Sequence, residues 1–142
     1  MNNDNWGDRA RIGMFIVSSE AVPEAEWQAM VPRGVSVHAA RVTAAAHWAE
    51  WRVDRNGVDL ADDLARGCQQ FASMELEAIV IGHTSSSVIG GKGWDEAVIA
   101  EMRTILGDTV HVTTNGADTI AGLMAVGAQR PFIVAPPWFG DA

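Results

Sequence analysis

The sequence predicts an α/β protein in which a parallel sheet of about four to five strands carries helices on both faces. Short apolar runs, typical of strands buried on both faces, alternate along the chain with longer stretches that have apolar residues at helical spacing. Strands that alternate with helices pair in parallel, because each helix carries the chain back across the sheet. The 142 residues suit one domain, so we expect a single lobe over residues 11–142 after a loose tail over residues 1–10.

Five segments have the composition of strands. The first is apolar at most positions and ends in two serines, and the second is entered through the turn residues Pro32 to Gly34. The expected strands are Arg11–Val17, Val35–Val42, Glu77–Ile81, Val110–Thr113 and Phe132–Ala135.

Four segments have the composition of helices. Pro23 and the acidic residues after it are typical of a first helical turn, and Gly107 and Gly127 are typical of helix ends. The stretch Thr43–Asn56 is rich in Trp and Ala and fits neither pattern, so we treat it as a candidate mobile or lid-like segment. The expected helices are Pro23–Met30, Val58–Ser73, Asp95–Leu106 and Asp118–Val126.

The composition excludes several classes of function. A formal net charge of −8 argues against a nucleic-acid or anionic membrane partner, since phosphate binding relies on clustered Lys and Arg. The single cysteine, Cys68, excludes an internal disulfide and favours a reducing, cytoplasmic location. The sequence has neither an apolar run of about 20 residues, the length that spans a bilayer, nor an N-terminal signal peptide.

The polar stretch Gly82–Ser87 follows the third expected strand and is the most informative part of the sequence. Ligands of parallel sheets bind beyond the carboxyl ends of the strands, so this stretch and Ser19-Glu20 are expected to meet at one edge. Hydroxyls and backbone N–H groups there can hold a carboxylate without a cationic side chain. The alternative is a Ser- and Thr-rich turn that satisfies only its own backbone.

His83 is the one histidine in this stretch, and an imidazole there can act as an acid or base near neutral pH. Glu20 is its candidate orienting partner; the alternative is that His83 only hydrogen bonds a neighbouring turn. The four histidines are too scattered for a metal site, so we expect no bound metal. Cys68 lies on the apolar face of an expected helix and is interpreted as an inert thiol.

Three stretches together share a pattern with one enzyme group. They are Arg11–Ser19 continued by Pro32–Val42; Ala78–Ser87 followed by Gly90-Gly91 and Gly93–Ala97; and Thr113-Thr114 with the next helix and Gly127–Arg130. With these stretches, nearly the whole chain beyond residue 10 resembles the maleate cis-trans isomerases and arylmalonate decarboxylases of the aspartate/glutamate racemase superfamily.

The resemblance implies a flavodoxin-like lobe of a two-lobe racemase-type fold. In that family two similar lobes bind substrate between them and use no cofactor. The chain ends where a second lobe would begin, so we expect this lobe to be absent, whether the chain is a fragment of a longer protein or a lone lobe. The substrate implied is a small mono- or dicarboxylate that reacts through an enediolate or carbanion.

The resemblance also assigns roles to particular positions. The first-lobe cysteine of the isomerases falls on His83, which is therefore the candidate catalytic residue for moving a proton. Thr84-Ser85 match the Thr-Ser of the decarboxylases and are expected to hold the carboxylate and enediolate. The remaining expected substrate contacts are Ser19, Glu20 in place of an asparagine, Thr114, and Trp138 in place of a tyrosine.

Two functions remain open at this level. The first is an isomerase or decarboxylase of this type. The second is a non-catalytic carboxylate-binding or oligomerisation module derived from a truncated racemase-type enzyme. In both cases the exposed face of a lone lobe favours a homo-oligomer.

Overall fold

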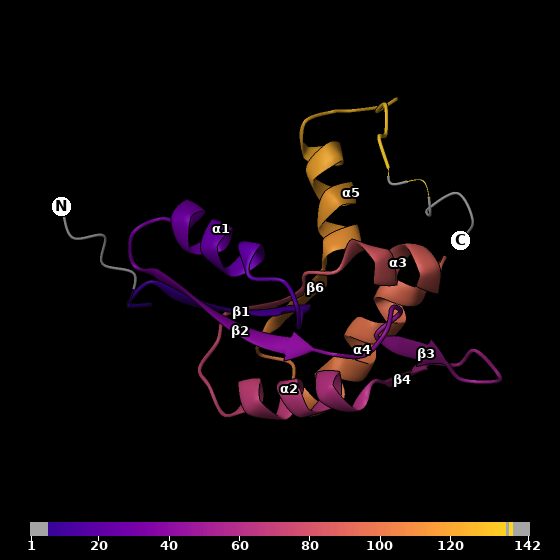
Figure 1. Ribbon diagram of the computed structural model, residues 1–142, viewed down its shortest axis with the longest axis horizontal. Coiled ribbons are helices and arrows are strands. Elements are labelled where there is room, and N and C mark those ends of the chain that lie inside the picture. Colours follow the sequence, from indigo (N-terminus) through magenta and orange to yellow (C-terminus); the bar gives the residue numbers. More distant parts are fainter. Residues whose placement is uncertain (1–5, 136, 138–142) are drawn as a thin grey trace.

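The computed structural model describes residues 6–135 and 137, and its core is a four-stranded parallel sheet with helices on both faces (Figure 1). The order of strands in this sheet is β2-β1-β5-β6, and a separate two-stranded hairpin joins β3 to β4. The strands are β1 (Ala10–Val17), β2 (Val35–Val42), β3 (Ala49–Trp51), β4 (Val58–Leu60), β5 (Ala78–Ile81) and β6 (His111–Thr114). The helices are α1 (Val22–Met30), α2 (Asp62–Ala72), α3 (Thr84–Gly90), α4 (Trp94–Leu106) and α5 (Asn115–Ala125).

The α/β class and the parallel pairing are therefore confirmed, and β2 has the predicted bounds. β1 begins at Ala10, inside the expected tail, and the N–H of Arg9 already donates to the carbonyl of Gly34. β1 pairs with β2 on one side and with β5 on the other. The chain thus leaves β1 toward one edge of the sheet and later returns to its opposite side, which makes β1 and β5 the topological switch point.

Each face of the sheet has its own apolar core, because alternate residues of a strand point to opposite faces. Phe15, Ile79 and Ile81 point to the larger core, which also contains residues of α2 and α4. Met14, Ile16 and Val80 point to the smaller core, which Trp27 of α1 partly covers. Burial on both faces explains why β1 and β5 are almost wholly apolar.

The stretch Thr43–Asn56 is not a lid, so that expectation was wrong. It contains β3, and the fully buried ring of Trp48 fills the larger core. The indole N–H of Trp51 donates to the carbonyl of Gly90 (2.8 Å), and that of Trp94 donates to the carbonyl of Ala49 (2.8 Å). Burying these rings and pairing their N–H groups fixes the hairpin to α3 and α4.

Two further boundaries differ from the prediction. Val58–Leu60 forms β4, so α2 begins only at Asp62. The polar stretch after β5 is not a loop, because α3 begins at Thr84. Ser86 and Ser87 lie near the beginning of this helix, and their hydroxyls have partners outside it.

Phe132–Ala135 does not form the fifth strand that its apolar composition predicts. These residues have no regular structure, and Phe132, Ile133 and Val134 are exposed. A strand needs a neighbour to pair with, and in the described chain β6 pairs with β5 alone. The preceding helix α5 has no buried residue and projects from the body of the molecule (Figure 1).

Two helical glycines provide a test of this packing. A Cβ at Gly67 of α2 would lie 2.4 Å from a ring carbon of Phe15, whereas a Cβ at Gly122 of α5 meets nothing within 4 Å. We expect Gly67→Ala to lower the free energy of unfolding by about 1–3 kcal/mol through overpacking. Gly122→Ala should leave it unchanged or raise it by up to about 1 kcal/mol, because alanine favours the helix. Urea denaturation measures both variants, and equal effects would contradict the close packing of α2 on β1.

Candidate functional site

The switch point brings two strand ends together. Ser18, Ser19 and Glu20 follow β1, and Gly82 and His83 follow the neighbouring strand β5. The N–H of Gly82 donates to the carbonyl of Phe15 at 2.9 Å, and a Cβ at Gly82 would lie 2.9 Å from that same oxygen. Glycine is therefore the residue that permits this close approach of the two backbones. The result is that His83, the residue before α3, lies directly beside the end of β1.

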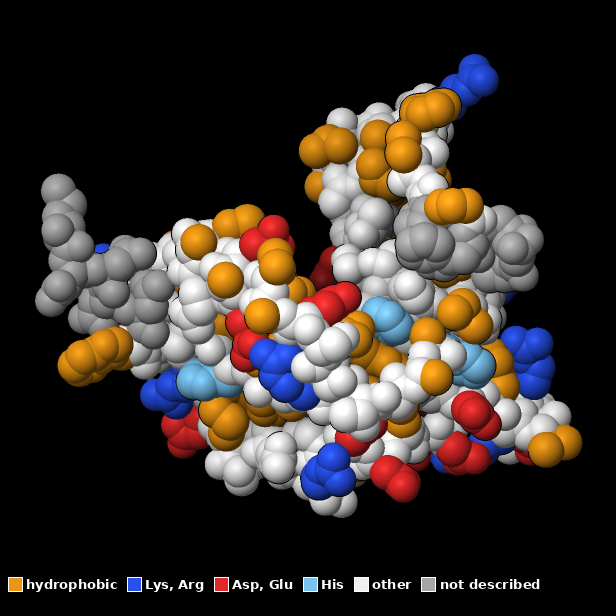
Figure 2. All heavy atoms as spheres, viewed as in Figure 1, with side chains coloured by type: hydrophobic (Ala, Val, Ile, Leu, Met, Phe, Trp, Pro, Cys, Tyr) orange, Lys and Arg blue, Asp and Glu red, His pale blue; other side chains and the backbone are white. Residues whose placement is uncertain are grey.

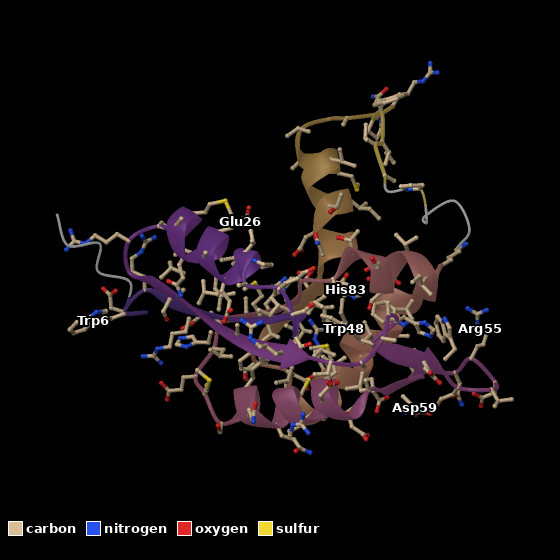
Figure 3. The ribbon with its side chains drawn as sticks, in the orientation of Figure 1. Trp6, Glu26, Trp48, Arg55, Asp59 and His83 are labelled. Atoms are coloured by element: carbon tan, nitrogen blue, oxygen red, sulfur yellow. The ribbon has the colours of Figure 1, made fainter. Side chains whose placement is uncertain are left out.

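His83 is half-buried, and its ring is held on two sides. The imidazole stacks on the indole of Trp48, with ring centroids 4.4 Å apart and planes inclined by 18° (Figure 3). Nδ1 of His83 lies 2.9 Å from the hydroxyl of Ser86, one turn further along α3. Burial lowers the pKa of His83 below its ordinary value of 6.5, and the charge of Glu20 opposes that shift. The ring is consequently neutral near pH 7.

Two of the expected hydroxyl groups stand beside His83 on α3. Thr84 is exposed, and its Oγ1 accepts a hydrogen bond from the side-chain amide of Asn115 at 2.8 Å. The hydroxyl proton of Thr84 remains available to a ligand. Ser85 is half-buried. The Asn115 contact ties the beginning of α3 to the beginning of α5, so polar side chains that follow β5 and β6 share this edge.

Thr114 is placed differently from the other expected contacts. It is fully buried and is the residue that caps α5: its Oγ1 accepts from the N–H of Ala117 and donates to the carboxylate of Asp95 at 2.6 Å. The same carboxylate oxygen accepts from the hydroxyl of Ser87 at 2.7 Å. Asp95 thus joins α3, α4 and α5, in addition to the dipole-compensating role that its first-turn position suggests. Thr114 therefore holds α5 and Asp95 in place through buried hydrogen bonds.

The loop after β1 carries Ser19 and Glu20 at the surface. The guanidinium of Arg41, at the end of β2, donates to the carbonyls of Ser18 (3.0 Å) and Glu20 (2.7 Å) and also pairs with Glu24. Arg41 therefore fixes this loop. Glu20 and His83 share no hydrogen bond among the described residues, so their interaction is through charge alone.

Trp138 and Cys68 are two further residues that the sequence singles out. Trp138 lies outside the described residues. Cys68 is fully buried, and burial raises the pKa of its thiol to about 12, which makes it inert. Within residues 6–135 and 137, no group of three or more His, Cys, Asp or Glu side chains could hold a metal ion. No helix of that same part of the chain is long and apolar enough to cross a membrane.

Three residues, Trp48, Ser86 and Asp95, make contacts at the candidate site that were not predicted from the sequence. Ser86 lies three residues after His83, a helical spacing that would have paired them if α3 had been recognised. Trp48 precedes His83 by 35 positions, and no local pattern connects the two. Asp95 lies in a first helical turn, where acidic residues are common, so its position in the sequence does not indicate its contacts with Ser87 and Thr114.

Comparison with known proteins adds the fold relationship. No protein-family model matches the chain, and no curated protein sequence matches it. Solved structures do match it, among them two of the maleate isomerase from Pseudomonas putida S16. The first, which contains maleate, has a TM-score of 0.63 at 17% identity and covers 83% of this chain and 49% of that one. The second has a TM-score of 0.57 at 14% identity and covers 83% and 50%.

The protein is therefore an α/β fold built on a parallel sheet, similar to about half of the maleate isomerase structure. At this identity the likeness establishes the fold and not the activity. The chain spans about half the length of the maleate isomerase structures that it matches.

Asp95 generates a prediction about how the site is supported. Asp95→Ala leaves the buried hydroxyl of Thr114 without its acceptor and releases that of Ser87. We expect a loss of about 2–3 kcal/mol in the free energy of unfolding, because hydrogen bonds to charged groups contribute about 1.5–3 kcal/mol each. Glu96→Ala, which removes a neighbouring first-turn charge, should cost less than about 1 kcal/mol. Equal losses in urea denaturation would show that Asp95 acts only through the helix dipole.

Proposed function

We propose that this chain provides half of a cofactor-independent site for small carboxylates, with chemistry of the isomerase or decarboxylase type. The observation that carries the proposal is the position of His83, Thr84 and Ser85 together at the switch point of the sheet, where α/β folds bind their ligands. The similarity to half of a maleate isomerase supports the same class of substrate. The sequence resemblance to the decarboxylases at Thr84-Ser85 supports it independently.

The chemistry requires a place for negative charge. An enediolate or carbanion next to a carboxylate concentrates charge on oxygen, and neutral donors aimed at that oxygen stabilise it by about 3 kcal/mol each. The hydroxyls of Thr84 and Ser85 and the ring of His83 are such donors. Arg41 is already bound to two carbonyls and Glu24, so neutral groups hold the anion at this edge. Ser19 and Glu20, in the loop after β1, form the border of the proposed site opposite α3. The proposal also includes a cytoplasmic location.

Binding is the first test. Titration of malonate or maleate with EDTA present should shift the amide resonances of Thr84 and Ser85 at millimolar ligand, because their hydroxyls donate to the carboxylate. Thr84→Val keeps the shape of the side chain but loses the hydroxyl, and should weaken binding about tenfold, the equivalent of one hydrogen bond to a charged group. Thr104→Val removes an exposed hydroxyl of α4 that bonds only the carbonyl of Glu101, and it should leave binding unchanged.

Shifts confined to residues remote from α3 would place the carboxylate elsewhere and refute the site. Turnover of the same acids, alone or with a partner lobe added, is a separate measurement. In the turnover measurement, His83→Ala should lower the rate of turnover roughly 100-fold and weaken ligand binding much less. The reason is that the hydrogen bond from His83 to the reacting oxygen strengthens in the transition state.

A second function, as an oligomerisation module, is favoured by α5. Ile120 and Met124 lie one turn apart on this helix and are 60% and 74% exposed, and Val126 and Phe132–Val134 extend the apolar surface. Figure 2 shows apolar side chains gathered over the projecting helix. We propose that a second copy of this chain covers them, because two copies bring identical apolar helices into a self-complementary contact.

Light scattering at micromolar concentration tests the association. The chain should behave as a dimer, and Ile120→Asp combined with Met124→Asp should make it monomeric by placing charge in the apolar contact. Val53→Asp is the matched control, since Val53 is a fully exposed apolar residue in the turn between β3 and β4. A monomeric unmodified chain, or a dimer that survives the α5 substitutions, would contradict the proposed contact.

A further inference from the structure

The ring of His83 can carry its proton on either nitrogen, and the contacts around Ser86 decide which. Ser86 is fully buried, and its hydroxyl oxygen accepts a hydrogen bond from the backbone N–H of Trp48 at 3.1 Å. The hydroxyl also has one proton to donate, and leaving it unpaired in a buried position costs about 1–3 kcal/mol. The acceptor of this proton therefore sets the state of the ring.

Nδ1 of His83 is that acceptor. It lies 2.9 Å from Oγ of Ser86. The helical hydroxyls of Thr104 and Thr119 each bond a preceding carbonyl, but among the described residues the hydroxyl of Ser86 has no carbonyl partner. Because the N–H of Trp48 fills one lone pair of Ser86, the serine proton points to Nδ1. A neutral ring that accepts at Nδ1 carries its own proton on Nε2.

Nε2 points away from these partners. It has no hydrogen bond within the described chain, and it is not among the buried side-chain atoms that lack a partner, so it is open to a ligand. Trp48 covers one face of the ring and is itself held by its N–H bond to Ser86 and by the N–H of Ala61, which donates to its carbonyl at 2.9 Å. The Nε2–H group is thus aimed by two fixed neighbours.

We infer that Ser86 and Trp48 hold His83 as the neutral Nε2–H tautomer, and that His83 acts as a hydrogen-bond donor to the carboxylate or enediolate oxygen and not as a base. The assignment of the tautomer depends only on the contacts of His83 with Ser86 and Trp48. The assignment of the ligand rests on the proposed function. The lowered pKa of His83 agrees with a neutral ring. As a donor the ring shares its proton with the oxygen and no bond to hydrogen is broken, a role that neutral imidazoles fill in other enzymes. Ser86 is a positioning residue in this arrangement.

The tautomer is measurable without any ligand. In protein labelled with ¹⁵N-histidine, at about pH 8 and so above the ordinary imidazole pKa, His83 should show a protonated Nε2 and a bare Nδ1. Exposed His111 gives the reference for a free mixture of tautomers. Ser86→Ala should move the Nδ1 resonance of His83 toward that mixture. Ser87→Ala removes the next hydroxyl of α3, which bonds Asp95, and should leave the resonance in place.

A proton on Nδ1 of the unmodified protein, or an unchanged Nδ1 resonance in Ser86→Ala, would overturn the inference. If Ser86→Ala does not fold, the tautomer of the unmodified protein still decides. The donor role has its own experiment, namely malonate binding to His83→Gln and His83→Ala. The amide of glutamine can replace an Nε2–H donor, so His83→Gln should bind within about threefold of the unmodified chain while His83→Ala binds about tenfold more weakly.

Equal losses in the two variants would refute the donor role. Absence of malonate binding in the unmodified chain would refute the proposed function and leave the tautomer result standing, so the two failures are distinguishable.

Discussion

The parallel ladder between β1 and β5 determines where the candidate site of this protein lies. It continues past the end of β5, where the N–H of Gly82 reaches the carbonyl of Phe15, and it brings the backbones so close that a side chain at Gly82 would meet that oxygen. His83 and α3 follow directly from this contact. The ladder is itself held by burial on both faces, with Phe15 and Ile81 in one core and Met14 and Val80 in the other.

The tryptophans extend this constraint to a segment far away in the sequence. Trp94 and Trp51 each use their indole N–H to fasten the β3–β4 hairpin to α3 and α4, and Trp48 is fully buried in the larger core. The same burial that stabilises the hairpin provides the flat apolar wall for the ring of His83. A histidine in water titrates near neutral pH, whereas this one is desolvated enough that its pKa is lowered. Packing and the protonation state of the site therefore have one physical origin.

The acidity of the chain shapes what the site can be. With a net charge of −8 and Glu20 at the border, an anionic ligand gains nothing from the overall field of the protein. Binding then depends on short, directed hydrogen bonds from neutral groups, and these fall off quickly with distance. The rigid fixing of His83, Thr84 and the loop after β1 is consistent with that requirement.

The sequence alone determined the sheet and most of its helices, because periodic burial leaves a local record: β2 was predicted at its observed bounds, and β1 and β5 were recognised from their apolar runs. It also located His83 and Thr84 at a strand end. Only the tertiary structure decided that Ser86 and Trp48 bind the ring of His83, that Thr114 turns inward to Asp95, and that Phe132–Ala135 remains unpaired. Those outcomes depend on partners distant in sequence, on hydrogen bonds that composition does not encode, and on whether a neighbouring strand edge is within reach. Periodicity records which face of an element is buried; it does not record which residue the element meets there.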